Sequence, residues 1–302
     1  MRPLPEISII IPVYNEAHTI KDVILGIIEV MNRSEMIYEL LIIDDGSTDG
    51  MRDFVDREIA TLIPNEIRQS RVKFVAHEIN KGYGAAIKAG ILHSLYPTLV
   101  IIDGDGTYPF ASIPELVGEI DSADMVVGSR SREGLSIYRR SVKCLLNNLA
   151  NYLTGIKIPD LNSGLRVMKK KIVNRFMPIL PDGFSLTTTI TLAMLINGYR
   201  VKYIPIAYLQ RKGGSKVNPL KDTVYFFQLI IRTIAYFKPL KVFLPLSSVF
   251  FILSFLALTY RFFNRGTPGV IALILFILGT QILVIGIVTD LINKINRGMR
   301  QE

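Results

Sequence analysis

Cysteine and histidine are scarce in this chain, and tryptophan is absent. Of the 302 residues, only Cys144 is a cysteine, and the three histidines, His18, His77 and His93, are scattered without ligand spacing. A single cysteine excludes an intrachain disulfide and a cysteine-based metal cluster. We interpret Cys144 as a helix-packing residue, and we predict no metal centre built from cysteine or histidine.

A secretory signal peptide and a nucleic-acid-binding motif are also missing. The apolar run Ile7–Val13 is short and leads straight into Tyr14-Asn15-Glu16, with no small-residue cleavage site. We therefore expect the N-terminal domain to stay in the cytosol. The formal charge is +9, but no basic recognition helix or aromatic RNA-binding motif accompanies it, so we expect no nucleic acid partner. Membrane phosphates are the expected partner of that charge.

Two long apolar runs lie near the C-terminus, Val242–Tyr260 and Gly269–Ile292. A helix of roughly 20 apolar residues crosses a bilayer core of about 30 Å, so we predict a membrane hairpin. Basic residues are more frequent on its outer flanks (Lys238, Lys241, Lys294, Arg297 and Arg300) than in the turn Arg261–Pro268, which favours both termini inside. We expect Asp290, near the inner end, to pair with a basic neighbour or reach water rather than to act inside the membrane.

Before the hairpin, short β-branched runs alternate with helix-like stretches. The predicted strands are Ile7–Val13, Glu39–Ile43, Val72–Ala76, Leu99–Ile102, Met125–Val127, Leu165–Met168 and Val201–Tyr208. The predicted helices are Thr19–Met31, Thr48–Thr61, Tyr83–Leu95, Ile113–Ile120, Ser136–Thr154 and Phe184–Asn197. Nearly continuous apolar strands alternating with helices indicate an α/β domain with a mostly parallel sheet. Ligands are expected outside the carboxyl ends of its strands.

Pro219–Lys238 is rich in aromatic and basic residues. We predict that it forms an amphipathic helix in the bilayer interface. The alternative is a helix that packs against the soluble domain.

Acidic clusters follow the predicted strands. Asp44-Asp45-Gly46-Ser47 comes after the second strand and Asp103-Gly104-Asp105 after the fourth. Two carboxylates one residue apart can face one Mg²⁺ or Mn²⁺ and leave positions open for diphosphate oxygens. A solvated acidic turn is the alternative, and the neighbouring clusters argue against it. We therefore predict a divalent cation at Asp103 and Asp105.

A set of motifs then occurs in a fixed order. They are Ile9-Ile10-Ile11-Pro12-Val13-Tyr14-Asn15-Glu16, Asp44-Asp45-Gly46-Ser47-Thr48-Asp49-Gly50, Asn80-Lys81-Gly82-Tyr83-Gly84, Asp103-Gly104-Asp105-Gly106-Thr107-Tyr108-Pro109 and Gly128-Ser129-Arg130. Together they resemble the family 2 glycosyltransferases, which have a GT-A fold. Asp160-Leu161-Asn162-Ser163-Gly164-Leu165-Arg166 and Arg211-Lys212-Gly213-Gly214-Ser215-Lys216 narrow the resemblance to dolichol-phosphate mannose synthases and bacterial polyprenyl-phosphate hexosyltransferases.

The resemblance implies an inverting transfer of a hexose from a nucleotide sugar to polyprenyl or dolichyl phosphate. GDP-mannose is slightly favoured as the donor, and UDP-glucose is the alternative. The nucleotide-sugar site would comprise Pro12, Tyr14, Glu16, Asp44, Asp45, Lys81, Gly82, Gly84 and Asp103. The glycines would allow close approach of the nucleotide because they lack side chains.

The resemblance also assigns the catalytic and metal-binding residues. The catalytic set would be Asp105, Asp160, Arg130 and Arg211, and the metal ligands would be Asp103 and Asp105, with Asp105 the more direct. Many relatives carry Gln at the position of Thr107, so a third protein ligand stays open here.

A lipid monophosphate acceptor needs cations rather than a strong base. Its second pKa is about 6, so it is largely dianionic at cytosolic pH, and guanidinium groups grip phosphate bidentately. The candidates are Arg130, Arg139, Arg140, Arg211, Ser215 and Lys216. Arg139 and Arg140 are chosen by position, and a solvated helix start is the alternative for that pair. Asp160 would orient an arginine or the sugar hydroxyls, and the glycine-hinged loop of Ser215 and Lys216 could close as a lid.

Three other functions are weighed against this one. A processive polysaccharide synthase is disfavoured because tryptophan is absent and only two spanning helices are predicted. A nucleotidyltransferase is disfavoured because the glycine-rich phosphate loop that such enzymes use is missing after the first strand. A non-catalytic membrane subunit or lipid carrier with a decayed transferase head is the alternative from another class, and the intact acidic motifs argue against it.

The predicted layout has four parts: a GT-A catalytic domain (1–216), a juxtamembrane amphipathic helix (217–240), two transmembrane helices (241–294) and a cytosolic tail (295–302). We expect an integral membrane protein of a prokaryotic plasma membrane or the ER, with its catalytic domain in the cytosol. A homo-oligomer is left open.

Overall fold

The computed structural model describes residues 4–55, 57, 71–130, 148, 150–152, 154–209, 228, 230–264 and 269–298. The strands of its head are β1 (Glu6–Val13), β2 (Ile37–Asp44), β3 (Val72–Ala76), β4 (Thr98–Ile101), β5 (Met125–Arg130), β6 (Arg166–Lys169) and β7 (Val201–Ile206). They form one sheet in the order β3-β2-β1-β4-β6-β5-β7. β6 is antiparallel to β4 and β5, and the other described pairs are parallel. The predicted mostly parallel sheet is confirmed.

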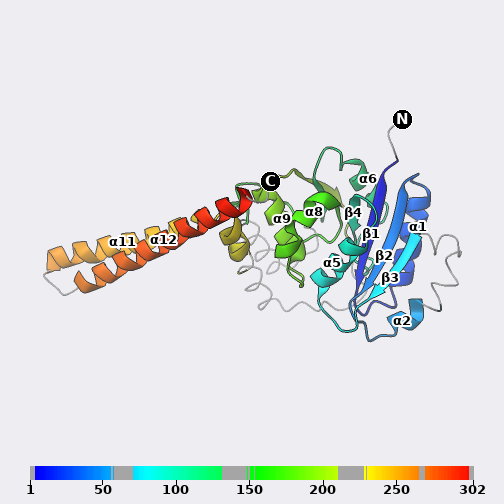
Figure 1. The fold of residues 1–302 in the computed structure, drawn as a ribbon, viewed down its shortest axis with the longest axis horizontal. Coiled ribbons are helices and arrows are strands. Elements are labelled where there is room, and N and C mark those ends of the chain that lie inside the picture. Colours follow the sequence, from blue (N-terminus) through cyan, green and yellow to red (C-terminus); the bar gives the residue numbers. More distant parts are fainter. Residues whose placement is uncertain are drawn as a thin grey trace.

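Helices cover both faces of the sheet (Figure 1). One face packs against α1 (Ile20–Asn32) and α6 (Ser112–Gly118), and the other against α5 (Tyr83–His93), α8 (Lys170–Phe176) and α9 (Leu186–Ile196). In β1, Ile9 and Ile11 join the first core and Ile10 the second, as the alternation of side chains along a strand requires. Burial on both faces explains why the strands read as continuous apolar runs.

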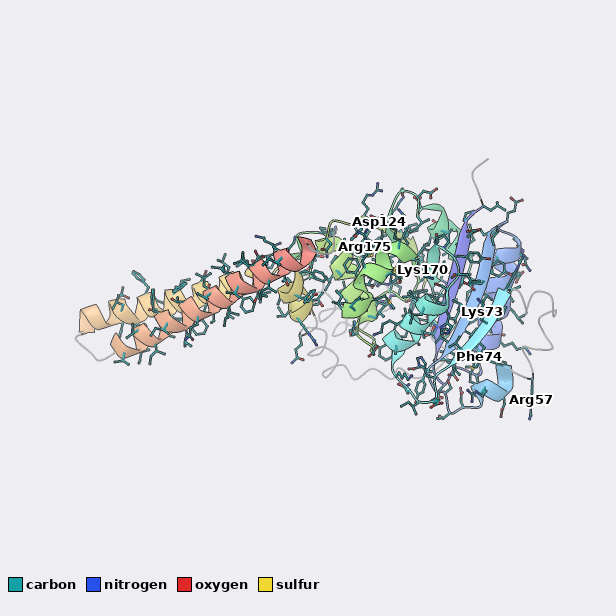
Figure 2. The ribbon with its side chains drawn as sticks, in the orientation of Figure 1. Arg57, Lys73, Phe74, Asp124, Lys170 and Arg175 are labelled. Atoms are coloured by element: carbon teal, nitrogen blue, oxygen red, sulfur yellow. The ribbon has the colours of Figure 1, made fainter. Side chains whose placement is uncertain are left out.

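The α11–α12 hairpin projects from the head as two helices that run side by side (Figure 1). α11 spans Leu240–Asn264 and α12 spans Gly269–Gly298. Both are long and apolar enough to cross a membrane, and their large apolar side chains point outward along the hairpin (Figure 2). Between the helices, Ser254 Oγ donates to the Ala272 carbonyl at 2.7 Å.

A hydrogen bond links the hairpin to the helix that precedes it. The Asn293 side-chain amide donates to the backbone carbonyl of Tyr236. The predicted pairing of Asp290 with a basic neighbour is confirmed, because Lys294 Nζ lies 2.9 Å from Asp290 Oδ2. Residues 228 and 230–237 are helical, in agreement with a helix over Pro219–Lys238. Ile230, Ile234 and Phe237 are buried in the core of the head, which favours the alternative that this helix packs against the soluble domain, and a position in the bilayer interface stays a prediction.

Some elements differ from the sequence-based prediction. α8 was not predicted, because it follows β6 without a break in the sequence pattern. α12 continues to Gly298, past the boundary predicted at residue 294. The short α2 (Met51–Phe54) occupies the start of the predicted helix Thr48–Thr61. Apart from Val55 and Arg57, the part of that helix after α2 lies outside the described residues, as does most of Ser136–Thr154.

Candidate active site

The loops after β1 and β2 are tied together at the carboxyl edge of the sheet. The backbone N–H of Asn15 donates to Ser47 Oγ at 2.9 Å, and the N–H of Thr48 donates to Asn15 Oδ1 at 2.7 Å. Asn15 adopts a left-handed conformation, with φ of +56°, which asparagine tolerates better than most residues. The predicted residues Tyr14 and Glu16 flank it, so the two loops form one surface.

The adjacent aspartates after β2 organise backbone rather than face open solvent. Asp44 Oδ1 accepts from the N–H and the hydroxyl of Ser47 at 3.0 and 2.5 Å. Asp45 is 3% exposed, and its oxygens accept from the N–H groups of Lys81 and Gly82 at 2.9 and 2.8 Å. His77 Nδ1 lies 2.8 Å from Asp45 Oδ1. Asp45 therefore holds the loop before α5, and a direct contact with base or ribose stays a prediction.

Gly82 and Gly84 lie against backbone from a distant part of the chain. Gly82 has φ of +104°, and a Cβ there would lie 2.5 Å from the Asp182 carbonyl oxygen. A Cβ on Gly84 would lie 2.8 Å from the Gly183 oxygen and closer still to that of Pro181. These glycines therefore allow close approach of the backbone of residues 181–183, and their place beside the nucleotide stays a prediction.

Asp103 lies partly buried after β4 and is held from two sides. Tyr83, at the start of α5, donates its hydroxyl hydrogen to Asp103 Oδ1 at 2.6 Å. On the other side, a Cβ on Gly164 would lie 2.5 Å from the Asp103 carboxyl carbon and closer still to Oδ2. The Gly164 N–H donates to the Tyr108 hydroxyl at 2.6 Å, which fixes the glycine in place.

The surroundings of Asp103 raise its pKa to about 6. Burial is the largest cause, the hydrogen bond from Tyr83 lowers the pKa, and the charge of Asp105 raises it. The charge of Arg130 lowers it. Two carboxylates that repel one another in this way are the arrangement that a divalent cation stabilises.

Thr107 supports Asp105. Its hydroxyl donates to Asp105 Oδ1 at 2.7 Å and its N–H to the same oxygen at 3.1 Å. Thr107 is fully buried and directs its hydroxyl at Asp105, so it supports that carboxylate.

Arg130 and Asp160 form a bidentate ion pair. Arg130 Nε and Nη2 lie 2.7 and 3.0 Å from the two oxygens of Asp160, which is completely buried. The guanidinium carbon lies 5.3 Å from the centre of the Tyr208 ring. Burial is the largest influence and lowers the pKa of Arg130, but the hydrogen bonds and charge of Asp160, together with Tyr108 and Tyr208, outweigh it and the net pKa is raised. The prediction that Asp160 orients an arginine is confirmed.

Arg166, which was not among the predicted site residues, is fully buried beneath this pair. It donates to the carbonyls of Leu161, Ser163 and Thr187 at 2.8, 2.6 and 3.0 Å. It thus fixes the 160–164 segment against α9. Its place at the end of the Asp160–Arg166 motif was the available signal in the sequence.

The predicted site divides into a part that the structure brings together and a part that it does not describe. Asp103, Asp105, Arg130 and Asp160 lie at the carboxyl edge of β4 and β5, opposite the edge marked by Asp124 in Figure 2. Lys81 is exposed and Pro12 is buried in β1. Arg139, Arg140, Arg211, Ser215 and Lys216 lie outside the described residues.

The fit of a divalent cation depends on this acidic pair. Among the described residues, no group of three His, Cys, Asp or Glu side chains could hold a metal ion. Asp103 and Asp105 are therefore a two-carboxylate donor set. Such a set fits Mg²⁺ or Mn²⁺, which in nucleotide-dependent enzymes take one or two carboxylates together with substrate phosphates and water.

Two bacterial transferases are similar to this chain in sequence. An undecaprenyl-phosphate 4-deoxy-4-formamido-L-arabinose transferase of Pseudomonas fluorescens is 30% identical over 245 residues, which cover 76% of this chain and 66% of that protein. The transferase of the same name from Salmonella choleraesuis is 26% identical over 312 residues, with 99% and 91% covered.

Solved structures share the fold of the head. Glucosyl-3-phosphoglycerate synthase of Mycobacterium tuberculosis, crystallised with Mn²⁺, UDP and phosphoglyceric acid, has a TM-score of 0.58 at 20% identity and covers 76% of this chain and 78% of its own. Mannosyl-3-phosphoglycerate synthase of Rubrobacter xylanophilus has a TM-score of 0.54 at 18% identity, with 77% and 73% covered.

Family comparison covers both parts of the molecule. Residues 238–295 match the GtrB C-terminal hairpin, in agreement with the predicted membrane hairpin. Residues 8–176, which include β1 to β6 and the acidic pair, match the family described as Glycosyl transferase family 2. The chain is therefore a membrane-anchored member of glycosyl transferase family 2.

Proposed function

We propose that this protein transfers a hexose from a nucleotide sugar to a polyprenyl phosphate at the cytosolic face of a membrane. The observation that carries the proposal is the meeting of an acidic pair and an oriented arginine at one sheet edge, in a chain with an apolar hairpin. The acidic pair suits a nucleoside diphosphate with its cation, and the arginine suits an anionic acceptor. The similar Pseudomonas and Salmonella proteins are named as transferases to undecaprenyl phosphate.

Asp103 and Asp105 would hold the divalent cation, which would supply positive charge for the departing nucleoside diphosphate. Asp105 would be the more direct ligand, with its carboxylate braced by Thr107. Tyr14, Glu16, Lys81 and the loops after β1 and β2 would bind the nucleotide beside it. The Mn²⁺ and UDP in the Mycobacterium structure are consistent with this arrangement, although that likeness concerns the fold.

The acceptor phosphate would act as the nucleophile. One of its oxygens forms a bond to the anomeric carbon while the bond from that carbon to the diphosphate oxygen breaks, and the electron pair leaves with the nucleoside diphosphate. A phosphate already dianionic at cytosolic pH needs no strong general base. Arg130 would hold this phosphate in line, because Asp160 fixes the orientation of its guanidinium plane.

GDP-mannose is our slightly favoured donor, and UDP-glucose is the alternative. The test is to incubate membranes containing the protein with polyprenyl phosphate, Mg²⁺ or Mn²⁺, and a panel of radiolabelled nucleotide sugars. The panel includes GDP-mannose, UDP-glucose and a nucleotide-activated formamido-arabinose. An acid-labile labelled lipid identifies the donor. Label from formamido-arabinose alone, a pentose derivative, would refute the transfer of a hexose, and no lipid product from any donor would refute the proposed function.

Two variants sharpen this test. Asp105→Ala should abolish lipid labelling, whereas Asp53→Ala, an exposed aspartate on α2, should leave it unchanged. Equal labelling by wild type and Asp105→Ala would refute the role of the acidic pair. If the protein binds polyprenyl phosphate and neither transfers nor hydrolyses any donor, it is a lipid carrier with an inactive head.

A further inference from the structure

Tyr83 lies within a motif that marks the nucleotide side of the site, yet its contacts are directed at Asp103. Its hydroxyl donates to Asp103 Oδ1 at 2.6 Å. Its ring stacks on Phe184 with 5.4 Å between centroids and 13° between planes. Because the ring is fixed by stacking at the start of α5, the hydroxyl is presented in one direction.

The segment that carries Phe184 is itself docked on α5. The N–H of Ala85 donates to the Asp182 carbonyl at 2.9 Å, and Lys88 forms an ion pair with the Asp182 carboxylate. Lys88 Nζ also donates to the Leu180 carbonyl at 3.1 Å. Phe184 is 74% exposed, so little besides its stacking on Tyr83 accounts for an aromatic residue at this position.

Gly164 closes the opposite side of the Asp103 carboxylate. The space for a Cβ on this glycine is already filled by the carboxylate atoms. Asp103 is thus confined between a hydroxyl donor from α5 and the backbone that leads into β6. Oδ1 accepts from the Tyr83 hydroxyl, and the carboxylate occupies the space that a side chain at position 164 would need.

We propose that Tyr83 is a positioning residue that fixes the Asp103 carboxylate for divalent cation binding, with Phe184 holding its ring. The inference rests on the proposed metal site at Asp103 and Asp105. Tyr83 touches neither nucleotide nor acceptor in this role. It prevents the carboxylate from adopting other rotamers, so less order has to be imposed when the cation binds.

The test uses Mn²⁺ affinity of the purified full-length protein in detergent with a fixed concentration of GDP or UDP, followed by electron paramagnetic resonance. Tyr83→Phe keeps the ring and its stacking and removes only the hydroxyl. We expect its Mn²⁺ dissociation constant to rise about tenfold, because loss of an outer-shell partner that orients a metal ligand typically costs roughly 10- to 100-fold in metal affinity. Excess Mn²⁺ should restore the turnover number of the variant, which a folding defect would not allow.

Tyr38→Phe is the matched control. Tyr38 is also buried and donates its hydroxyl hydrogen, at 3.1 Å, to Asn32 on the other face of the sheet. The Tyr38→Phe variant should bind Mn²⁺ as tightly as wild type does. An unchanged Mn²⁺ affinity in Tyr83→Phe, or an equal loss of affinity in Tyr38→Phe, would overturn the inference.

Wild type and Asp105→Ala separate this inference from the function on which it rests. If wild type binds no Mn²⁺, or if Asp105→Ala binds it as tightly, the proposed metal site fails. If wild type binds and Asp105→Ala does not, while Tyr83→Phe matches wild type, only the role of Tyr83 fails.

Discussion

Replacing Gly164 by alanine should displace the Asp103 carboxylate while adding a single methyl group. The new Cβ would lie 2.5 Å from the carboxyl carbon and 2.7 Å from Oδ1, where ordinary contact begins at 3.4 Å. The carboxylate must therefore retreat by about 1 Å, a misplacement that can lower a catalytic rate about a hundredfold. The overpacking itself should cost about 1–3 kcal/mol of unfolding free energy.

Gly118→Ala is the matched control, because a Cβ at Gly118, the last residue of α6, has no neighbour within 4 Å. It should be neutral or stabilising by about 0.5 kcal/mol. The assay compares initial rates of labelled lipid formation and thermal unfolding for the two variants and wild type. A Gly164→Ala enzyme with more than half of wild-type activity would refute the reasoning that Asp103 occupies a confined and functional position.

Three further predictions concern the same edge. Without metal, the pKa of Asp103 is about 6 in the folded protein against 3.8 ordinarily, so its stabilising contribution is complete below pH 3.8 and is lost as pH rises through 6. By linkage that loss is about 3 kcal/mol at pH 7.5 and about 1 kcal/mol at pH 4.5. Asp103→Asn should therefore melt higher than wild type in EDTA, by about three times as much free energy at pH 7.5 as at pH 4.5, and a pH-independent difference would contradict this. Arg130→Lys keeps the positive charge but loses the planar guanidinium that can donate two parallel hydrogen bonds. The KM for polyprenyl phosphate should therefore rise about tenfold, while the KM for the donor stays unchanged. A change confined to the donor KM would count against an acceptor role. Asp45→Ala should remove hydrogen-exchange protection from the Lys81 and Gly82 amides and weaken nucleotide binding, and retained protection would show that Asp45 does not hold that loop.

The sheet could be read from the sequence because its strands are apolar on both faces. Each predicted strand corresponds to a strand of the structure, with small shifts at the ends. The direction of β6 could not be read, since strand–helix alternation predicts parallel pairing and nothing in the short run Leu165–Met168 encodes its orientation. The acidic pair and Arg130 could be singled out because they stand in recognisable motifs, and their roles stay predictions.

The supporting residues were harder to predict because their partners are distant in the chain. Gly82 meets backbone at residue 182, and Tyr83 meets Asp103 twenty positions away. Periodicity and spacing describe local structure only. They do not reveal that these residues meet partners far away in the chain. Gly164 belongs to the Asp160–Arg166 motif, but its packing against Asp103 depends on β4 and β6 lying side by side in the sheet.

The reversed direction of β6 has a consequence for how such an enzyme can diversify. Arg130 ends β5, and Asp160 lies thirty positions later in the chain; their pairing fastens both ends of the intervening stretch to the same rim. Loss of either partner would leave the other charge at this rim without its counter-ion, and Asp160 is completely buried. The two positions should therefore vary together rather than singly among related enzymes.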